Sequence, residues 1–336
     1  MPTSDSAWVL GVDSGASGVR VALAPAADGG GPAARAAEPR PALTGDRGID
    51  AASLLGLVTP LVRELMRAAG VTRIGTACVG AAGMATLGED LRARLPEAFA
   101  EVFGVRRLAL AGDAVTAYAG ALGLRPGVVV AGGTGMIALG VSTDGTRWRR
   151  ADGWGHLLGD AGGGAWIGRE GLDAALRAHD GRAGGSKALL ARAEERFGPA
   201  ASLPGQVYPR PDRPAFLAAF APEVARCAAE DPVASDILRR AATHILETAA
   251  AVRPGPGPVD VALTGGLFKM GEPLLAPLRD QADWLLPEAE LCPAAGDPLD
   301  GAVLIAGALH RSALTLPADP ALLTVAGTAE GSRPAP

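Results

Sequence analysis

Two glycine-rich segments of the chain carry the residue types that suit phosphate binding. The first, Asp13–Ser17, reads Asp-Ser-Gly-Ala-Ser, and the second, Gly132–Gly135, reads Gly-Gly-Thr-Gly. Glycine allows positive φ and a close approach of backbone to ligand, so successive N–H groups in such turns can form an anion-binding concavity. The hydroxyls of Ser17 and Thr134 add side-chain donors. The predicted phosphate-binding residues of the two turns are Asp13, Ser14, Gly15, Ser17, Gly133, Thr134 and Gly135.

Asp13 leads the first turn and is the predicted metal ligand. A carboxylate in this position can hold Mg²⁺ directly or through water. The competing interpretation of either segment is a plain hairpin turn, because glycine-rich turns are common. Two other phosphate-binding motifs are excluded. No Gly-Lys-Ser/Thr follows Gly132–Gly135, and Gly15 and Gly18 do not give the Gly-x-Gly-x-x-Gly spacing.

Each glycine turn lies between two short apolar runs, which predicts an antiparallel hairpin. Trp8–Val12 and Arg20–Leu23 flank the first turn, and Gly127–Ala131 and Met136–Val141 flank the second. Runs of this length bounded by turn residues are typical of strands. A hairpin closed by a glycine turn therefore occurs once in each half. This pattern predicts two similar lobes, each presenting one turn to a shared cleft.

Helices and strands alternate along the rest of the chain, which predicts an α/β protein. Asp50–Ala69 has apolar residues at helical spacing, and we expect Pro60 to kink or split that helix. Asp113–Leu122 is a predicted helix capped by Asp113. Residues 326–336 are predicted to form a disordered tail. The other predicted helices are Glu89–Phe103, Trp166–Ala178, Ser186–Arg196, Pro214–Glu230, Pro232–Ala251, Glu272–Gln281 and Asp300–Arg311, and the other predicted strands are Arg73–Val79, Arg107–Ala111 and Val259–Leu263.

The composition excludes several classes of protein. The net charge is −5, so the chain has no basic field for nucleic acid or an anionic membrane. The longest apolar run, Gly127–Val141, is interrupted by glycines and too short to span a bilayer. Met1–Ala7 lacks the pattern of a signal peptide. Cys78, Cys227 and Cys292 are widely separated, which disfavours a zinc or iron–sulfur site within one chain and fits a reducing cytosol. We therefore predict a cytoplasmic protein.

The order of the motifs along the chain resembles the N-acetylglucosamine kinase and BadF/BadG/BcrA/BcrD ATPase branch of the sugar kinase/Hsp70/actin superfamily. The most specific part is Gly-Trp-Gly-His-Leu-Leu-Gly-Asp followed by Trp-Ile-Gly-Arg-Glu. The resemblance covers nearly the whole chain. The matching segments are Gly11–Ser17, Gly112–Ala114, Val128–Ala138, Gly153–Asp160, Trp166–Glu170, Leu263–Phe268 and Pro298–Ala302.

The resemblance implies two ribonuclease-H-like lobes, as in actin-like ATPases, around a central ATP cleft. One lobe would comprise residues 1–120 with a C-terminal helix at about 300–325, and the other residues 121–299. The helices Ala114–Gly123 and Asp300–Leu309 would cross at the hinge. Both are rich in Ala and Gly, which independently lets two helix backbones pass closely.

The resemblance also implies a role for each site residue. The two turns would grip the triphosphate of ATP with Mg²⁺, and Gly265 and Gly266 would lie against the adenosine. Asp113 would act as general base. A homodimer is implied by the family alone. The residues placed near a sugar substrate are Asp113, Thr134, Trp154, Gly155, His156 and Asp160.

Each of these residues also has a structural interpretation. Asp113 at a strand-to-helix corner could be only a helix N-cap. Asp160 before Gly162 could be a turn aspartate that bonds its own backbone. Trp154 could be a core aromatic, although the glycines on both sides favour an exposed ring. His156 could be purely structural.

The predicted activity is transfer of the γ-phosphate of ATP to a hydroxyl, the 6-hydroxyl, of an amino sugar such as N-acetylglucosamine or glucosamine, with another hexose as an open option. The sequence departs from the family pattern mainly on the acceptor side. No Asn lies near Thr44, and Ala161 stands where a Glu is common. The first turn has Ser14 and Ala16 at glycine positions. The alternatives are an ATPase that activates a radical dehydratase and a non-catalytic nucleotide-dependent sensor.

Overall fold

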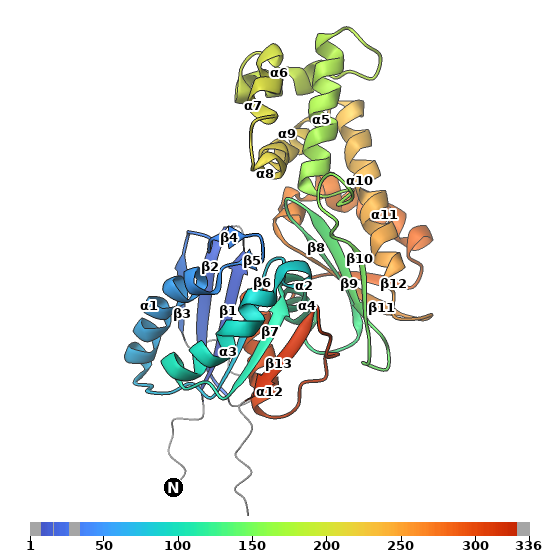
Figure 1. Cartoon of the computed structure of the whole chain (residues 1–336). Helices are drawn as coiled ribbons and strands as arrows, with labels where there is room; N and C mark the ends of the chain where they lie inside the picture. Colours follow the sequence, from blue (N-terminus) through green and yellow to red (C-terminus); the bar gives the residue numbers. More distant parts are fainter. Residues whose placement is uncertain (1–7, 16, 27–33, 328–336) are drawn as a thin grey trace, which may run out of the picture. The chain divides into compact units, whose positions relative to one another are not determined.

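The chain folds into two compact units, described here from a computed structural model of residues 8–15, 17–26 and 34–327 (Figure 1). Unit 1 contains Met1–Pro126, Thr143–Trp148 and Ala294–Pro336, and unit 2 contains Gly127–Ser142 and Arg149–Pro293. The first change of unit thus falls a few residues after the lobe boundary predicted at residue 120. Unit 1 also includes the C-terminal segment Ala294–Pro336, and the resemblance implied a C-terminal helix in this lobe.

The sheet of unit 1 has the strand order β13-β7-β6-β1-β2-β3. The strand β1 pairs antiparallel with β2 and parallel with β6, which pairs parallel with β7. The carboxyl ends of β1, β6 and β7 therefore share one edge of the sheet. The strands are β1 (Trp8–Gly15), β2 (Gly18–Pro25), β3 (Ala34–Glu38), β6 (Thr76–Ala81), β7 (Arg107–Gly112) and β13 (Leu323–Gly327), with a separate small pair β4 (Thr44–Gly45) and β5 (Gly48–Ile49).

One face of this sheet is covered by α1 (Ala51–Ala69) and α3 (Glu89–Phe103), whose buried apolar residues join one core with β1, β2, β6 and β7. Pro60 does not split α1, because a single helix runs through it. Pro60 and Gly56, whose carbonyl loses its partner, are both exposed. Water can therefore satisfy that carbonyl at the solvent face.

The opposite face is covered by α12 (Pro298–His310), which packs on β1, β6 and α4 (Asp113–Leu122) (Figure 1). The predicted close passage of two Ala- and Gly-rich helices is confirmed here. A Cβ at Gly301 would overlap the Thr116 carbonyl of α4, and one at Gly120 would overlap the Asp297 carbonyl. Glycine at these positions is what lets α4 and α12 approach backbone to backbone.

Unit 2 contains a second sheet in the order β10-β9-β8-β11-β12. The strands β8 and β9 form the predicted antiparallel hairpin, and β11 pairs parallel with β8. The strands are β8 (Gly127–Gly132), β9 (Met136–Val141), β10 (Trp148–Asp152), β11 (Val259–Thr264) and β12 (Ala289–Pro293). The helices are α5 (Gly164–His179), α6 (Lys187–Phe197), α7 (Leu203–Val207), α8 (Arg213–Ala218), α9 (Ala221–Cys227), α10 (Pro232–Ala251) and α11 (Glu272–Leu285), with 3-10 turns at Ala200–Ser202 and Gly266–Met270.

Several predicted elements need correction. The single helix predicted over Pro214–Glu230 is instead α8 and α9, separated where Pro222 starts the second helix. Proline has no N–H and suits the first turn of a helix rather than its interior. The short helix α2 (Met84–Leu87) was not predicted. The strands β10, β12 and β13 were not predicted.

The disordered C-terminal tail was predicted to begin at residue 326, which is too early in the sequence. Ala326 and Gly327 belong to β13, which pairs antiparallel with β7, whereas residues 328–336 lie outside the described part of the chain. Within the described residues, no helix has both the length and the apolar character needed to cross a membrane.

Candidate functional site

The first turn lies at the end of the β1–β2 hairpin, where Gly15 pairs with Gly18. Gly18 has φ +134°, and a Cβ there would overlap the Glu38 carbonyl of β3. Only glycine therefore fits at the point where β2 starts. Ser17 is exposed at the turn, and Ala16 lies outside the described residues. The predicted phosphate donors at Gly15 and Ser17 are thus at an accessible tip.

Asp13 lies directly opposite Arg20 in the β1–β2 ladder. The Arg20 Nε and Nη2 atoms donate to the same carboxylate oxygen, Oδ2, at 3.0 and 2.6 Å. Burial raises the pKa of the Asp13 carboxyl above the ordinary aspartate value, while the hydrogen bonds and charge of Arg20 act in the opposite direction. The predicted metal ligand is therefore paired with a cation on one oxygen.

Arg20 also reaches the first turn of α12. Its Nη1 donates to Asp297 Oδ2 at 2.7 Å. Asp297 is the N-cap of α12 and forms a reciprocal capping box with Asp300. Burial alone would raise the pKa of Asp297, but the Asp300 backbone N–H and the Arg20 charge outweigh it and hold that pKa below its ordinary value. One guanidinium thus connects the first turn to a helix end.

Ser14 is placed differently from its neighbour Asp13. Successive residues of a strand point to opposite faces, and Gly11 and Asp13 face α12. The Ser14 hydroxyl therefore faces the other side, where it is 1% exposed and has no hydrogen-bond partner among the described residues. Its side chain does not lie beside the Asp13 carboxylate.

Asp113 lies on the same sheet edge as Asp13. Ser14 is in register with Ala81 of β6, and Ala81 with Gly112 of β7. Two strand spacings, about 10 Å, separate Ser14 from Gly112, and each aspartate is the chain neighbour of one of these two residues. Asp113 is exposed, as a group that meets substrate must be.

The N-cap prediction for Asp113 is wrong. Gly112 is the N-cap of α4, and Asp113 is the first helical residue. Its Oδ1 accepts a hydrogen bond from the adjacent Ala114 N–H at 2.9 Å. A carboxylate in the first turn still benefits from the positive end of the helix dipole.

The second turn is held by the backbone of α5. The Gly164 and Ala165 N–H groups donate to the carbonyls of Gly133 and Thr134 at 2.9 and 2.8 Å. These N–H groups belong to the first turn of α5, where no intrahelical partner exists. Gly133 and Thr134 are exposed. The carbonyls of the turn therefore accept hydrogen bonds from α5. The positive end of the helix dipole beside the turn favours the binding of an anion.

Asp160 joins this turn to the Gly153–Asp160 loop. Its Oδ1 accepts from the Gly155 N–H at 3.0 Å, and the Met136 backbone N–H also donates to the carboxylate. A Cβ at Gly135 would overlap Oδ2 of Asp160. Asp160 is 8% exposed, and burial raises the pKa of its carboxyl above the ordinary value, with repulsion from Asp152 acting in the same direction.

Asp152 is a site residue that sequence reasoning missed. Its Oδ1 accepts the Asp160 N–H at 2.6 Å, and both residues have left-handed φ, +61° and +57°. Aspartate tolerates this conformation better than most residues. Its position at the end of an unpredicted strand, β10, left no motif to reveal it.

The loop itself exposes apolar side chains. Trp154 is 67% exposed, so its interpretation as a core aromatic is wrong. The Arg150 guanidinium lies 4.9 Å from the Trp154 ring centroid and covers one face. Leu157 and Leu158 are also exposed. His156 is half-buried beside them.

Gly265 and Gly266 follow β11, next to the second turn. Gly265 has φ +101°, and a Cβ there would overlap the Gly132 carbonyl. Thr264 is in register with Ala131 of β8. Unit 2 therefore brings together the second turn, the start of α5, Asp160 and the predicted adenosine-side glycines.

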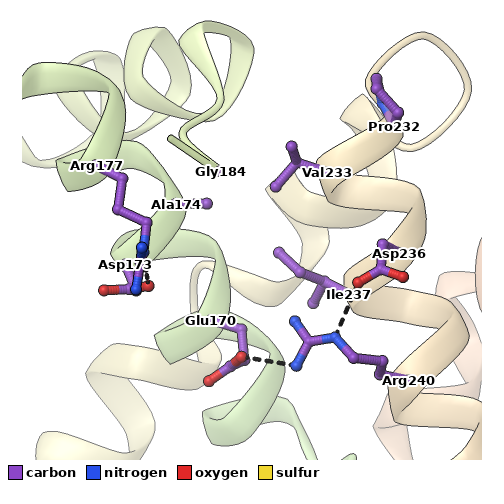
Figure 2. Close-up of a pocket in the computed structure, with 10 residues that line it drawn as sticks. All are labelled: Glu170, Asp173, Ala174, Arg177, Gly184, Pro232, Val233, Asp236, Ile237 and Arg240. Atoms are coloured by element: carbon purple, nitrogen blue, oxygen red, sulfur yellow. Dashed lines mark hydrogen bonds and ion pairs between the residues drawn. The ribbon is translucent and has the colours of Figure 1, made fainter. Parts of the chain in front are cut away.

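A hollow of about 470 Å³ lies elsewhere in unit 2, between α5 and α10 (Figure 2). Arg240 bridges Glu170 and Asp236 at 2.9 and 3.0 Å across it. The α5 residues that line it begin at Glu170, six residues beyond Gly164, or about 9 Å along the helix axis. None of the predicted site residues lines this hollow.

No group of three or more His, Cys, Asp or Glu side chains in the described part of the chain could cage a metal ion. Mg²⁺ usually takes one or two carboxylates, with phosphate oxygens and waters completing its octahedron. Asp13 fits that requirement. Its Oδ2 is paired with Arg20, while Oδ1 accepts no hydrogen bond from a described residue.

A comparison with known families decides what this chain is similar to. A model of the BadF/BadG/BcrA/BcrD ATPase family matches residues 10–306. The chain belongs to this family. The match runs from β1 to α12 and includes both glycine turns, Asp113 and Asp160.

Individual relatives of this chain are named as sugar kinases. The N-acetylmuramic acid/N-acetylglucosamine kinase of Clostridium acetobutylicum is 36% identical over 113 residues, which is 34% of this chain and 35% of that protein. The aligned part thus spans about a third of the curated relative. A Chromobacterium violaceum structure, provisionally named an N-acetylglucosamine kinase, matches at 28% identity and TM-score 0.71, over 89% of this chain and 99% of that one.

A third comparison supports the fold alone. A ROK family glucokinase from Streptomyces griseus, solved with glucose and AMPPNP, matches with TM-score 0.55 and 19% identity, over 91% of this chain and 99% of that one. The expected α/β fold of actin-like sugar kinases is therefore confirmed.

Proposed function

We propose that this protein is an ATP-dependent sugar kinase. The observation that carries the proposal is the position of Asp160. Its buried carboxylate contacts both Gly135 of the second turn and Gly155 of the Trp154 loop. A phosphate-binding turn and a loop suited to a sugar are thus held by one side chain, as transfer between two substrates requires.

The nucleotide would be bound by both turns. The proposed phosphate contacts are backbone N–H groups with the hydroxyls of Ser17 and Thr134, and Gly265 and Gly266 would take the adenosine. When bound, Mg²⁺ would neutralise charge on the phosphates, held by Asp13. The full proposed set for ATP is Asp13, Ser14, Gly15, Ser17, Gly133, Thr134, Gly135, Gly265 and Gly266.

Asp113 is the proposed general base. It is exposed at the carboxyl end of β7 and its Oδ1 is oriented by the Ala114 N–H. A sugar hydroxyl is a weak nucleophile, and a carboxylate that takes its proton assists attack on the phosphorus. Phosphoryl transfer otherwise depends on positioning and charge neutralisation.

The proposed acceptor is an amino sugar, N-acetylglucosamine or glucosamine, phosphorylated at the 6-hydroxyl. The names of the Clostridium acetobutylicum and Chromobacterium violaceum proteins support this class. The free face of Trp154 suits the C–H surface of a pyranose, and Asp160 and His156 lie on the same loop. Polar groups on a sugar need such partners, because an unpaired buried group is costly.

A coupled ADP-release assay across amino sugars and hexoses tests the proposal. We expect release to depend on one sugar class, with the phosphate located by mass spectrometry of the product. Asp113→Asn should lower turnover by about 10²–10⁴-fold, the usual contribution of a general base, while ATP binding stays unchanged. Binding of ATP without release for any sugar would instead favour a non-catalytic sensor.

A further inference from the structure

Arg20 of β2 makes three charged hydrogen bonds beside the first turn, and the proposed function gives it no role. Two go to Asp13 Oδ2 and one to Asp297 Oδ2, at 3.0, 2.6 and 2.7 Å. Hydrogen bonds between ionised groups are shorter and stronger than neutral ones. Arg20 is therefore held at both ends of its guanidinium.

The contact with Asp13 is one-sided. Both Arg20 donors meet Oδ2, and no hydrogen bond from a described residue reaches Oδ1. The Asp13 side chain is 12% exposed, so its rotation is restricted. A carboxylate held by one oxygen presents the other in a defined direction.

The surrounding charges do not balance at Asp13. Arg35 pairs with Asp297 and Asp300 at 3.8 and 2.5 Å. With Arg20, two guanidinium groups therefore face three carboxylates. The network that contains Asp13 therefore has one more carboxylate than guanidinium, and its net negative charge attracts a cation.

We propose that Arg20 is a positioning residue for Asp13. It holds Oδ2, anchors itself on the Asp297 cap of α12, and so directs Oδ1 toward the divalent cation that accompanies the nucleotide. The inference rests on the proposed function, in which Asp13 is the metal ligand. A group that orients a metal ligand typically changes metal affinity by about 10–100-fold when it is removed.

The test measures Mn²⁺ binding by electron paramagnetic resonance, with the protein saturated with ADP and no sugar present. Arg20→Met should weaken Mn²⁺ binding by about 10–100-fold, and Arg20→Lys should restore part of it. The affinity for ADP in EDTA, measured by fluorescence competition, should change by less than about twofold in both variants.

The matched control is Arg35→Met. Arg35 belongs to the same charge network but does not contact Asp13, so its loss should leave Mn²⁺ affinity within about twofold. A thermal melt of each variant shows whether it is folded. If Arg20→Met fails to fold, the Mn²⁺ affinity of Arg20→Lys is compared with that of wild type, and a weaker affinity in Arg20→Lys supports the inference.

A double-mutant cycle tests whether Arg20 affects Mn²⁺ binding through Asp13 or through direct contact with the nucleotide. Asp13→Asn and Arg20→Met should each weaken Mn²⁺ binding, and the double variant should be no weaker than Asp13→Asn alone, because residues that act as one unit are non-additive. Additive losses, or a loss of ADP affinity in EDTA with Arg20→Met, would show that Arg20 contacts the nucleotide itself and overturn the inference. If wild type binds neither ADP nor Mn²⁺·ADP, the proposed function fails instead.

Discussion

The two glycine turns look alike in sequence but are held by different forces. The first is held by side-chain charges, since Arg20 connects Asp13 to the cap of α12. The second is held by backbone, since α5 donates to its carbonyls, and the buried Asp160 contacts it as well. The backbone contacts that hold the second turn leave no room for a Cβ at Gly163 or Gly164, beside that turn.

The two turns also differ in which glycine positions could accept a side chain. In the first turn, Ser14 and Ala16 occupy positions where the family often has glycine, and a Cβ at Gly15 would meet nothing within 4 Å. In the second turn and the start of α5, a Cβ at Gly163 or Gly164 would lie 2.9 or 2.6 Å from backbone atoms of that turn.

The largest expected effect is from Gly164→Ala. The new Cβ would press on the Gly133 carbonyl and separate the turn from α5. Such overpacking costs about 1–3 kcal/mol, and ATP affinity should fall by about 5- to 150-fold if a comparable cost falls on binding. Thermal melts and titration with an ATP analogue measure both. Gly133→Ala is the control for stability, because its Cβ would meet nothing within 4 Å. Equal melting temperatures for the two variants would contradict backbone support of the turn.

Asp160→Asn comes next in size. It removes a charged acceptor that the Gly155 and Met136 N–H groups share, which should destabilise the protein by about 1–3 kcal/mol at neutral pH. Because burial raises the native pKa of Asp160, the native state binds more protons than the unfolded state just above the ordinary aspartate pKa. The Asp160 contribution to stability is therefore greatest at low pH and declines as pH rises through the native pKa.

Asp160→Asn should remove that decline from the pH profile of the melting temperature. An unchanged profile would mean that the carboxyl is ionised in both states across this range, and the proposed burial effect would be rejected.

A smaller loss of stability is expected when the charged contact that supports the first turn is removed. Asp297→Asn keeps the N-cap of α12, since Asn caps as well as Asp, but removes the charge that Arg20 contacts. We expect a loss of about 0.3–1 kcal/mol that diminishes in high salt. Asp297→Ala also loses the cap and should cost about 0.5–2 kcal/mol more. Denaturant titrations at two salt concentrations separate the two. A salt-independent loss in Asp297→Asn would argue against support by charge.

The smallest effect is expected for Gly15→Ala. Open space surrounds the site and no positive φ is required there, so stability should change by less than about 0.5 kcal/mol. A large loss would show that the first turn also depends on glycine, and the contrast between the turns would disappear.

The sequence predicted the two hairpins, both turns and most long helices, because their apolar spacing and glycine positions are local signals. The crossing of α4 and α12 was predicted from the family resemblance, and their small residues gave an independent reason to expect a close passage. The short strands β10, β12 and β13 were missed, since each is only five residues long, and β13 pairs with β7, which lies far away in sequence.

For the candidate site, residue types pointed to Asp13 and the family resemblance pointed to Asp113 and Asp160, but neither showed what holds these side chains. Arg20 could have been found, because a hairpin that pairs Gly15 with Gly18 must place residue 20 opposite Asp13. The contact of Asp152 with Asp160 and that of Asp297 with Arg20 could not, because they depend on the folded loop and on tertiary packing that no local pattern encodes.

The central claim is that both turns serve one nucleotide. Isothermal titration with a non-hydrolysable ATP analogue and Mg²⁺ tests it most directly, in wild type, Asp13→Asn and Gly164→Ala. The account predicts one nucleotide per chain, bound more weakly in both variants. Two nucleotides per chain, or undiminished affinity in either variant while it remains folded, would contradict it.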